Sequence, residues 1–220
     1  MMVKSKQVFI LIMVTLPIFI ILTSIRIALT PSFLEIEYRM PGFPKDPYGF
    51  SFEERLNWAK ISLQYLLNRE GIEFLSDQRI LKDTALFNSR ELGHMEDVKQ
   101  LVQFSLKLWW ILLFCFIATI FLSLSHGWVR DFWYWISRGG WLTILIIIII
   151  LLGVFFSFNL LFTGFHRIFF EGDSWLFYTS DTLIRLFPER FWQDVFIWLG
   201  GLSLLQAFIA IKIGHHFGTK

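Results

Sequence analysis

Four long runs of apolar residues dominate the pattern of the chain, at about 8–29, 107–125, 141–163 and 193–213. A helix needs about 20 consecutive apolar residues to cross the hydrocarbon core of a bilayer, and each run meets that length. Pro17 in the first run is compatible with such a helix, because neighbouring helices can satisfy the carbonyl group that a proline leaves free. We therefore predict an all-α membrane protein, a bundle of four transmembrane helices in a single membrane domain over residues 1–220.

The segment between the first and second spans predicts further helices outside the membrane. Ser51 and Glu54 have the spacing of a capping box and precede apolar residues at helical spacing, which predicts a helix that ends at Gly71. Before it, residues 31–49 hold four prolines and two glycines, a composition typical of a turn-rich segment without helix. We expect this region to form a helical cap between the first two spans.

The stretch between that helix and the second span gives a weaker signal. Residues 72–88 resemble loop and short helix in composition. Asn88 or Ser89 can then cap a helix that continues directly into the second span. The predicted helical cap outside the membrane therefore ends with a helix that extends the second span.

Charge adds the orientation of the spans. Hydrophobic residues make up 55% of the chain and charged residues 17%, with a formal net charge of +2. The short segments 1–7, 125–140 and 212–220 carry a basic excess over a single acid, Asp131: Lys4, Lys6, Arg130, Arg138, Lys212 and Lys220. The positive-inside rule then places both termini in the cytoplasm and the loops 30–106 and 164–192 outside. The loop before the second span is net acidic, so no nucleic-acid partner is predicted.

The first span and the cysteine usage exclude other classes. The first span follows two lysines like a secretory signal, but it is long and no A-x-A site follows it, so we interpret it as a retained signal anchor. Cys115 is the only cysteine and lies within the second span. The chain therefore has no C-x-x-C pair, and we predict no metal site and no cofactor.

The outer loop 164–192 and the adjoining helix ends hold the candidate chemistry. Residues 160–192 combine many aromatic rings with charged side chains, as expected where hydrocarbon meets water. His166 ends the third span at the outer side, and His94 lies just before the outer start of the second. The topology therefore places two histidines at one membrane boundary, although they are far apart in sequence. Ionisable groups at such depth are candidates for function.

Charged neighbours suggest supporting roles around these histidines. Glu91, His94 and Asp97 are spaced by three residues and share a helix face, where a carboxylate could orient the imidazole. Asp181 and Arg185 stand four apart and could form an ion pair, which would serve either as a structural clamp or in substrate binding.

Four blocks of the sequence carry a resemblance to a known family. They are REL-HMEDVK before the second span, FHRIFF at the end of the third, then W-F, and DTLIRLFPERFW before the fourth. In this order they resemble the four-span bacterial lipoprotein intramolecular transacylases. The resemblance implies an enzyme of the bacterial cell membrane that acts at its outer leaflet on a diacylglyceryl lipoprotein and contacts membrane lipid. It also implies that His94 and His166 are catalytic.

The reaction implied by the resemblance moves the acyl chain from the middle glycerol position to the amine of the N-terminal cysteine. One histidine could act as base and the other as acid, with Arg167, Arg185 or Tyr178 near the oxyanion. The chain has no G-x-S-x-G elbow, so a direct attack by the amine of the substrate is favoured. Two alternatives stay open: a metal-dependent membrane hydrolase, and a non-enzymatic accessory or receptor protein.

Overall fold

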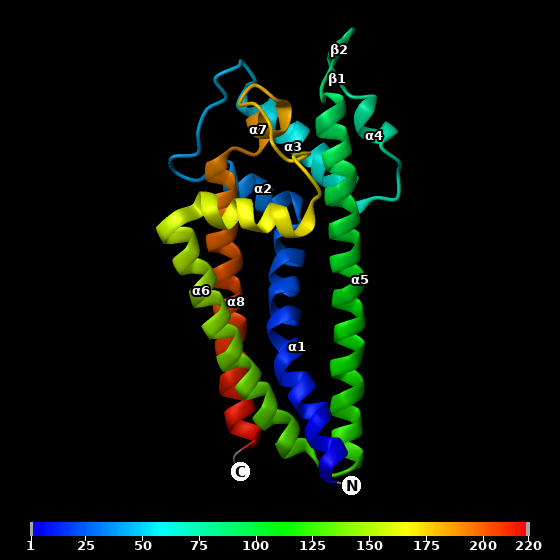
Figure 1. The fold of residues 1–220 in the computed structure, drawn as a ribbon, viewed down its shortest axis with the longest axis vertical. Coiled ribbons are helices and arrows are strands. Elements are labelled where there is room, and N and C mark those ends of the chain that lie inside the picture. The colour runs from blue at the N-terminus through cyan, green and yellow to red at the C-terminus, as the bar shows by residue number, and fades with distance from the viewer. Residues whose placement is uncertain (1, 219–220) are drawn as a thin grey trace. The chain divides into compact units, whose positions relative to one another are not determined.

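The structure is a computed structural model that describes residues 2–218. Four long helices run through it (Figure 1). They are α1 (Met2–Ala28), α5 (Ser89–Ser125), α6 (Val129–Phe169) and α8 (Glu189–Gly218). Shorter elements lie between them: α2 (Pro31–Glu37), α3 (Phe52–Leu67), α4 (Glu73–Ser76), α7 (Thr182–Leu186) and the antiparallel strands β1 (Arg79–Leu81) and β2 (Thr84–Ala85).

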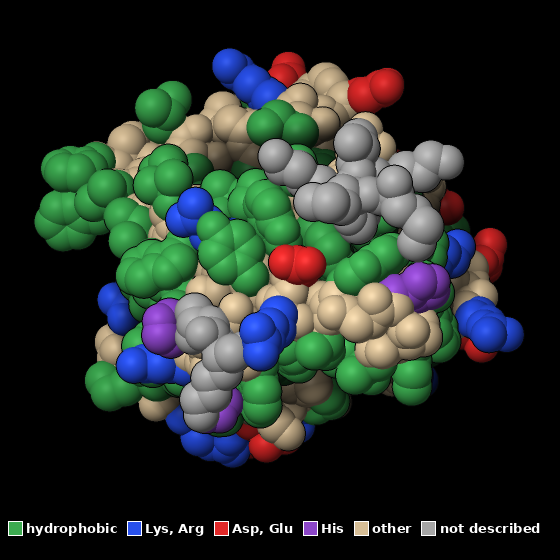
Figure 2. All heavy atoms as spheres, turned by 90° about the horizontal axis from the view of Figure 1, so that it is seen from below, with side chains coloured by type: hydrophobic (Ala, Val, Ile, Leu, Met, Phe, Trp, Pro, Cys, Tyr) green, Lys and Arg blue, Asp and Glu red, His purple; other side chains and the backbone are tan. Residues whose placement is uncertain are grey.

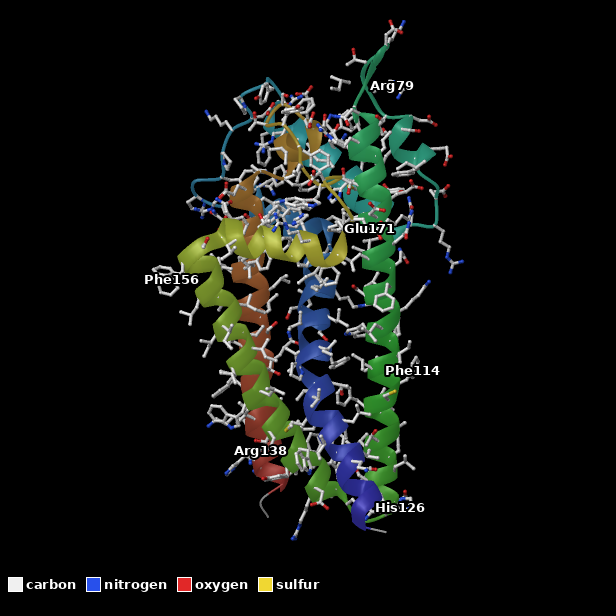
Figure 3. The ribbon with its side chains drawn as sticks, in the orientation of Figure 1. Arg79, Phe114, His126, Arg138, Phe156 and Glu171 are labelled. Carbon is white, nitrogen blue, oxygen red and sulfur yellow. The ribbon has the colours of Figure 1, made fainter. Side chains whose placement is uncertain are left out.

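The four long helices are each long and apolar enough to cross a membrane. This confirms the predicted fold class, a helical protein with four spans. Large apolar side chains on these helices are widely exposed. Phe114 on α5 and Phe156 on α6 are 62% and 77% exposed and point away from the ribbon in Figure 3. Hydrophobic side chains also cover much of the face drawn in Figure 2. Exposed apolar surface on this scale is typical of a protein whose solvent is lipid.

The described chain divides into two compact units. The first contains the residues up to Arg26, Leu106–Phe156 and the residues from Phe196 onward, and the second contains Ile27–Ser105 and Ser157–Val195. Each of the long helices therefore has residues in both units. Lys220, which contributed to the predicted orientation, lies outside the described residues.

Close helix packing characterises the first unit. A Cβ atom at Gly140 on α6 would lie 2.7 Å from Ile211 and 2.9 Å from the carbonyl oxygen of Ala207 on α8, so only glycine fits there. Small residues allow such approach between membrane helices. A buried polar link joins α1 to α8, where the Ser24 and Ser203 hydroxyls lie 2.9 Å apart. Hydrogen bonds between helices are among the forces that hold membrane bundles together.

The second unit corrects the prediction for residues 31–49. Residues Pro31–Glu37 form α2 rather than a turn-rich segment, and Thr30 caps the helix through a bond from the Phe33 amide to its hydroxyl (3.3 Å). Pro31 occupies the first helical position, where its missing N–H costs nothing and its fixed φ favours the helix. The prolines at 41, 44 and 47 do follow in non-helical chain.

The next helix of this unit agrees with the prediction. Ser51 and Glu54 form the reciprocal capping box, and α3 then runs over Phe52–Leu67, ending four residues before Gly71. Residues 72–88 contain the predicted short helix, α4, but also the β1–β2 hairpin, which the composition of this stretch did not indicate. α3 packs against α2 and α7. These contacts build the frame that carries the candidate site.

The third span also departs from its predicted bounds. α6 begins at Val129, inside the segment expected to be an inner loop, and its backbone leaves helical geometry at Ser157 (φ −161°, ψ 82°). The helix resumes beyond this kink and ends at Phe169. The part after the kink belongs to the second unit and carries His166.

Candidate active site

The two histidines lie together in the second unit. His94 is on the second turn of α5 and His166 is near the end of α6. Their ring centroids are 6.2 Å apart with an interplanar angle of 24°. Both residues are buried, with 9% and 8% of their surface exposed. The structure thus brings together two imidazoles that lie on different helices and far apart in the sequence.

His166 has a defined hydrogen bond. Its Nδ1 lies 2.8 Å from the backbone carbonyl oxygen of Phe162, one helical turn earlier. A carbonyl oxygen only accepts hydrogen bonds, so Nδ1 must carry the proton. In the neutral ring, Nε2 then holds the free lone pair. The backbone of α6 therefore presents Nε2 of His166 as a proton acceptor.

His94 lacks such a partner. Its Nδ1 is buried without a hydrogen-bond partner among the described residues. A buried polar atom without a partner carries a free-energy cost of about 1–3 kcal/mol, and groups of this kind require an explanation. The rings of Phe170 and Phe177 lie against His94, with centroids at 4.9 and 5.3 Å. His94 is therefore an apolar-packed imidazole whose nitrogen is available to a ligand.

The Glu91 carboxylate forms hydrogen bonds with backbone amides and none with His94 among the described residues, although the sequence spacing predicts a bond to the imidazole. Its carboxylate accepts hydrogen bonds from the backbone amides of Asn88 (2.8 Å) and Leu183 (2.7 Å). A reciprocal hydrogen bond runs from the Glu91 backbone amide to Oδ1 of Asn88 at 3.0 Å. Glu91 therefore closes a capping box at the start of α5 and fastens that helix to α7. The fully buried carboxylate is a structural link between two elements of the site.

The other predicted neighbours, Asp97, Arg167 and Tyr178, have exposed side chains. Tyr178 is 69% exposed. The guanidinium of Arg90 lies 5.1 Å from the Tyr178 ring centroid, and no ring contact joins Tyr178 to either histidine among the described residues. Among the described residues, no hydrogen bond or ion pair joins these three side chains to either histidine.

Asp181 pairs with a different arginine from the one predicted. Its carboxylate accepts from Arg90 Nη2 (2.8 Å), from Asn88 Nδ2 (3.1 Å) and from the Tyr178 amide (2.9 Å). The predicted Asp181–Arg185 pair is wrong, because Asp181 precedes α7 as its N-cap residue and faces the start of α5. Arg90 lies 91 positions from Asp181 in the sequence, so helical spacing could not predict this pair. Asp181 therefore ties the loop after α6 to the first turn of α5.

Arg185 pairs with Asp46 instead. Its Nε and Nη2 donate to the two oxygens of Asp46 at 3.2 and 2.9 Å, and its guanidinium lies 3.6 Å from the Phe50 ring centroid. The Asp46 side chain is fully buried and that of Arg185 is 11% exposed. Bidentate bonds of this kind are strong and orientation-specific. Arg185 thus joins the segment before α3 to α7.

The charge of Asp46 makes this ion pair sensitive to pH. Burial opposes the charged form, but hydrogen bonds from Arg185 and from the Phe50 amide outweigh it, so the pKa of Asp46 lies below its ordinary value of 3.8. The pair therefore stabilises the fold fully above the unfolded pKa. Its contribution is lost as pH falls through the lower, folded-state pKa.

We expect Asp46→Asn to lower the free energy of unfolding by about 3 kcal/mol at pH 7, since it leaves Arg185 buried without its partner. Thermal unfolding in detergent measures the difference from wild type, which should shrink as pH falls below 3.8. Glu35→Gln is the matched control, because its pair with Lys60 is half exposed and such pairs contribute about 0–1 kcal/mol. A deficit of the same size at pH 7 and at the acid limit would contradict this assignment.

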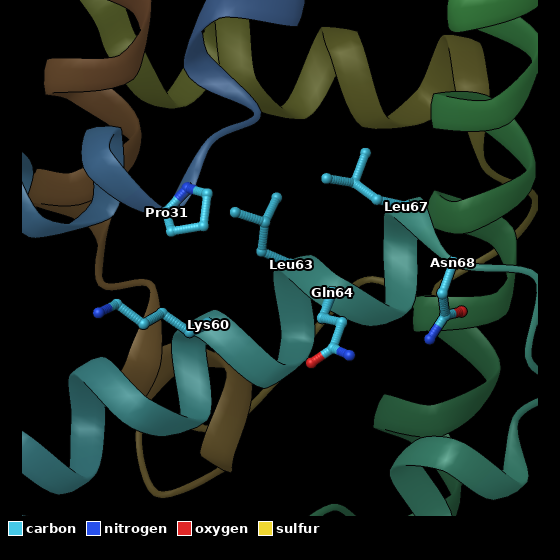
Figure 4. Close-up of a pocket in the computed structure, with 6 residues that line it drawn as sticks. All are labelled: Pro31, Lys60, Leu63, Gln64, Leu67 and Asn68. Atoms are coloured by element: carbon cyan, nitrogen blue, oxygen red, sulfur yellow. The ribbon is translucent and has the colours of Figure 1, made fainter.

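A cavity of about 400 Å³ lies elsewhere in this unit (Figure 4). One face of α3 and the start of α2 line it, with Pro31, Lys60, Leu63, Gln64, Leu67 and Asn68. None of these is a predicted site residue. We place the candidate site at the histidines, because a buried pair of imidazoles is a candidate for proton transfer. No group of three metal-binding side chains occurs within residues 2–218.

Comparisons with known proteins cover nearly the whole chain. The family described as lipoprotein intramolecular transacylase Lit matches residues 10–192. An uncharacterized protein of Aquifex aeolicus (strain VF5) is 32% identical over 209 residues, which cover 95% of this chain and 94% of that protein.

Solved structures show the same fold. The in meso structure of the lipoprotein intramolecular transacylase Lit from Bacillus cereus matches with a TM-score of 0.81 at 16% identity, over 100% of this chain and 98% of that one. Two variants of that enzyme, in which one histidine is replaced by alanine or arginine, match with TM-scores of 0.70 and 0.65 at 15% identity. They cover 98% of this chain and 94% and 92% of theirs.

Proposed function

The chain belongs to the lipoprotein intramolecular transacylase family, whose members are acyltransferases, and we propose that it moves an acyl chain within one lipoprotein molecule. The acyl chain leaves the middle glycerol oxygen (sn-2) of the substrate's S-diacylglyceryl group and joins the α-amine of the substrate's N-terminal cysteine. The observation that carries the proposal is the buried pair His94 and His166, which two separate helices hold at 6.2 Å.

His166 is the proposed base. Its Nε2 holds the lone pair, because Nδ1–H is engaged by the Phe162 carbonyl. The pKa of an α-amine is ordinarily about 8, so a neutral imidazole can take its proton as the nitrogen attacks the ester carbonyl. The N–C bond forms, the bond from carbonyl carbon to glycerol oxygen breaks, and the proton passes to that oxygen. General acid–base steps of this kind contribute about 10²- to 10⁴-fold to a rate.

His94 is the proposed donor to the developing negative charge. An N–H of a neutral imidazole can hydrogen-bond the oxyanion of the tetrahedral intermediate, and a site packed by Phe170 and Phe177 makes that bond stronger than it would be in water. In the free protein, Nδ1 of His94 has no partner among the described residues. The developing charge would supply one. Arg167, Arg185 and Tyr178 have no part in this mechanism.

The substrate itself supplies the nucleophile, which explains why the site needs no activated serine or cysteine. Amine and ester belong to one molecule, so binding need only orient them, and well-oriented intramolecular reactions reach effective molarities of about 10⁵–10⁸ M. The described residues around the two histidines are mainly aromatic. Such surroundings suit an uncharged ester on a lipid chain.

The orientation in the bacterial cell membrane is part of the proposal. Basic residues at the termini and between the second and third spans favour cytoplasmic termini, which puts the histidines at the outer leaflet. Lipoprotein substrates and membrane lipid would meet the site there. A reporter fused after Lys220 that proved extracytoplasmic would contradict this orientation.

A synthetic diacylglyceryl lipopeptide with a free cysteine amine tests the function. Because the reaction is an isomerisation, we expect the intact mass to stay constant while the free amine disappears and fragmentation shows an N-acyl cysteine. The protein is incubated with the lipopeptide in liposomes, and the products are analysed by mass spectrometry. A product lighter by one acyl chain, with the amine still free, would identify a hydrolase instead.

A further inference from the structure

The loop after α6 lays aromatic rings over both histidines. Trp175 lies on His166 with ring centroids 4.8 Å apart, and Phe177 lies on His94 at 5.3 Å. Phe170, at the base of the loop, contacts both imidazoles at 4.9 and 5.4 Å. On the α6 side, Phe162 covers His166 at 4.1 Å. The imidazole pair is therefore enclosed by rings that offer no oxygen or carboxylate to hold a water.

This loop is held in place by specific bonds. Asp181 joins it to Asn88 and Arg90 at the start of α5, the helix that carries His94. The guanidinium of Arg90 also lies 5.4 Å from the Phe177 ring centroid. Within the loop, the Trp175 indole donates to the Gly172 carbonyl at 3.1 Å, and Gly172 has a φ of +59° that glycine tolerates best. The two rings are thus fixed over the histidines by contacts that do not involve the histidines.

The enclosure matters because water competes with the amine. A base that removes a proton from an amine can equally remove one from water. The water oxygen would then attack the same carbonyl carbon, the bond to the glycerol oxygen would break, and that oxygen would take the proton. The products would be a free fatty acid and a lipoprotein that lacks both the sn-2 chain and the N-acyl group. Excluding water from a closed site is a recognised way to suppress such hydrolysis.

We propose that Trp175 and Phe177, the rings that the 170–181 loop places over His166 and His94, exclude water and so determine that an amine rather than water receives the acyl group. The inference rests on the proposed function. It assigns a second, suppressed activity to the same histidine pair: ester hydrolysis, with water as the acceptor. Neither ring takes part in proton transfer, and both act through the solvent access of the imidazoles.

The test measures how the acyl group divides between the two acceptors. Wild type, Trp175→Ala and Phe177→Ala are incubated with the diacylglyceryl lipopeptide in H₂¹⁸O. The amount of fatty acid carrying one ¹⁸O atom measures hydrolysis, and the amount of N-acyl lipopeptide measures transfer. We expect the ratio of hydrolysis to transfer to rise at least about tenfold in each variant, because water gains access to the imidazoles.

Two further variants separate this role from a structural one. Leu176→Ala is the matched control, because Leu176 lies between the two rings in the same loop, is 47% exposed and has no ring to place on a histidine; its ratio should match wild type. Trp175→Phe keeps an aromatic ring and should restore most of the wild-type ratio. If an alanine variant does not fold, Trp175→Leu and Phe177→Leu, which keep apolar bulk but not the ring, take its place and should show an intermediate ratio.

The outcomes distinguish the two proposals. If hydrolysis and transfer fall together at a constant ratio in the ring variants, the rings only stabilise the fold and this inference is wrong. If Leu176→Ala raises the ratio as much as Trp175→Ala, the loop rather than its rings controls water, which also overturns it. If wild type itself gives no N-acyl product, the proposed function fails instead.

Discussion

Replacing either buried histidine with alanine should reduce acyl transfer by about 10²- to 10⁴-fold while the protein remains folded. His166 would lose the lone pair at Nε2, and His94 would lose the group that meets the oxyanion. Rates are measured with the lipopeptide, and folding by thermal unfolding in detergent. His166→Asn sharpens the test, because its amide can still donate to the Phe162 carbonyl but offers no basic nitrogen. It should be as inactive as His166→Ala.

A matched control for these variants is His126→Ala. His126 is exposed and belongs to the turn between α5 and α6, so its loss should leave the rate within about twofold of wild type, because it moves no proton in the reaction. Losses below roughly threefold in both His94→Ala and His166→Ala would exclude the histidine mechanism.

Glu91→Ala should have the largest effect on stability, because two backbone amides, those of Asn88 and Leu183, would lose their acceptor in a buried position. A buried donor left unsatisfied costs about 1–3 kcal/mol, so the loss of acceptor for two amides should lower the free energy of unfolding by about 2–6 kcal/mol. Thermal unfolding measures this loss. Glu91→Gln, which retains one carbonyl oxygen as an acceptor, should lose about half as much.

The activity of the Glu91 variants separates structure from chemistry. Since no hydrogen bond joins the carboxylate to His94 among the described residues, transfer should fall no further than the folded fraction does. A Glu91→Gln variant with wild-type stability and a large loss of rate would show that this carboxylate assists the histidine after all, as the sequence spacing suggested.

The long apolar runs of the sequence correctly predicted the four membrane-spanning helices. The four spans follow from apolar runs whose length must match the bilayer, and this constraint leaves few alternatives. The capping box at Ser51 and Glu54 was also predicted correctly, because it depends only on residues three positions apart. The meeting of His94 and His166 followed from the topology, because two helix ends at one membrane boundary lie near each other.

The supporting residues were harder to predict, because their partners are distant in sequence. The three-residue spacing predicts that Glu91 bonds to His94 on the same helix face. In the structure its carboxylate oxygens instead accept hydrogen bonds from the backbone amides of Asn88 and Leu183. Asp181 likewise bonds to Arg90 rather than to its helical neighbour. In both cases helical spacing predicts a pair, but tertiary contacts offer better hydrogen-bond donors.

The start of α2 and the aromatic loop after α6 differ from what the sequence composition predicts. Pro31 follows Thr30, a capping residue, which is the usual start of a helix, yet the later prolines suggested a turn-rich segment. The aromatic residues after His166 were attributed to the membrane interface, whereas Trp175 and Phe177 lie on the two imidazoles. Composition identified an aromatic loop but could not show which rings face the site.

A mixing experiment tests whether the acyl group moves directly within one substrate molecule. A donor lipopeptide with heavy acyl chains and an acceptor lipopeptide of different sequence with light chains are incubated together with the protein, and N-acyl products are read by mass spectrometry. Direct O-to-N transfer predicts heavy N-acyl groups on the donor peptide alone, light ones on the acceptor alone, and no acyl adduct on the protein. Heavy N-acyl groups on the acceptor above background, or an acylated residue in this chain, would contradict the mechanism and show that the histidines serve another nucleophile.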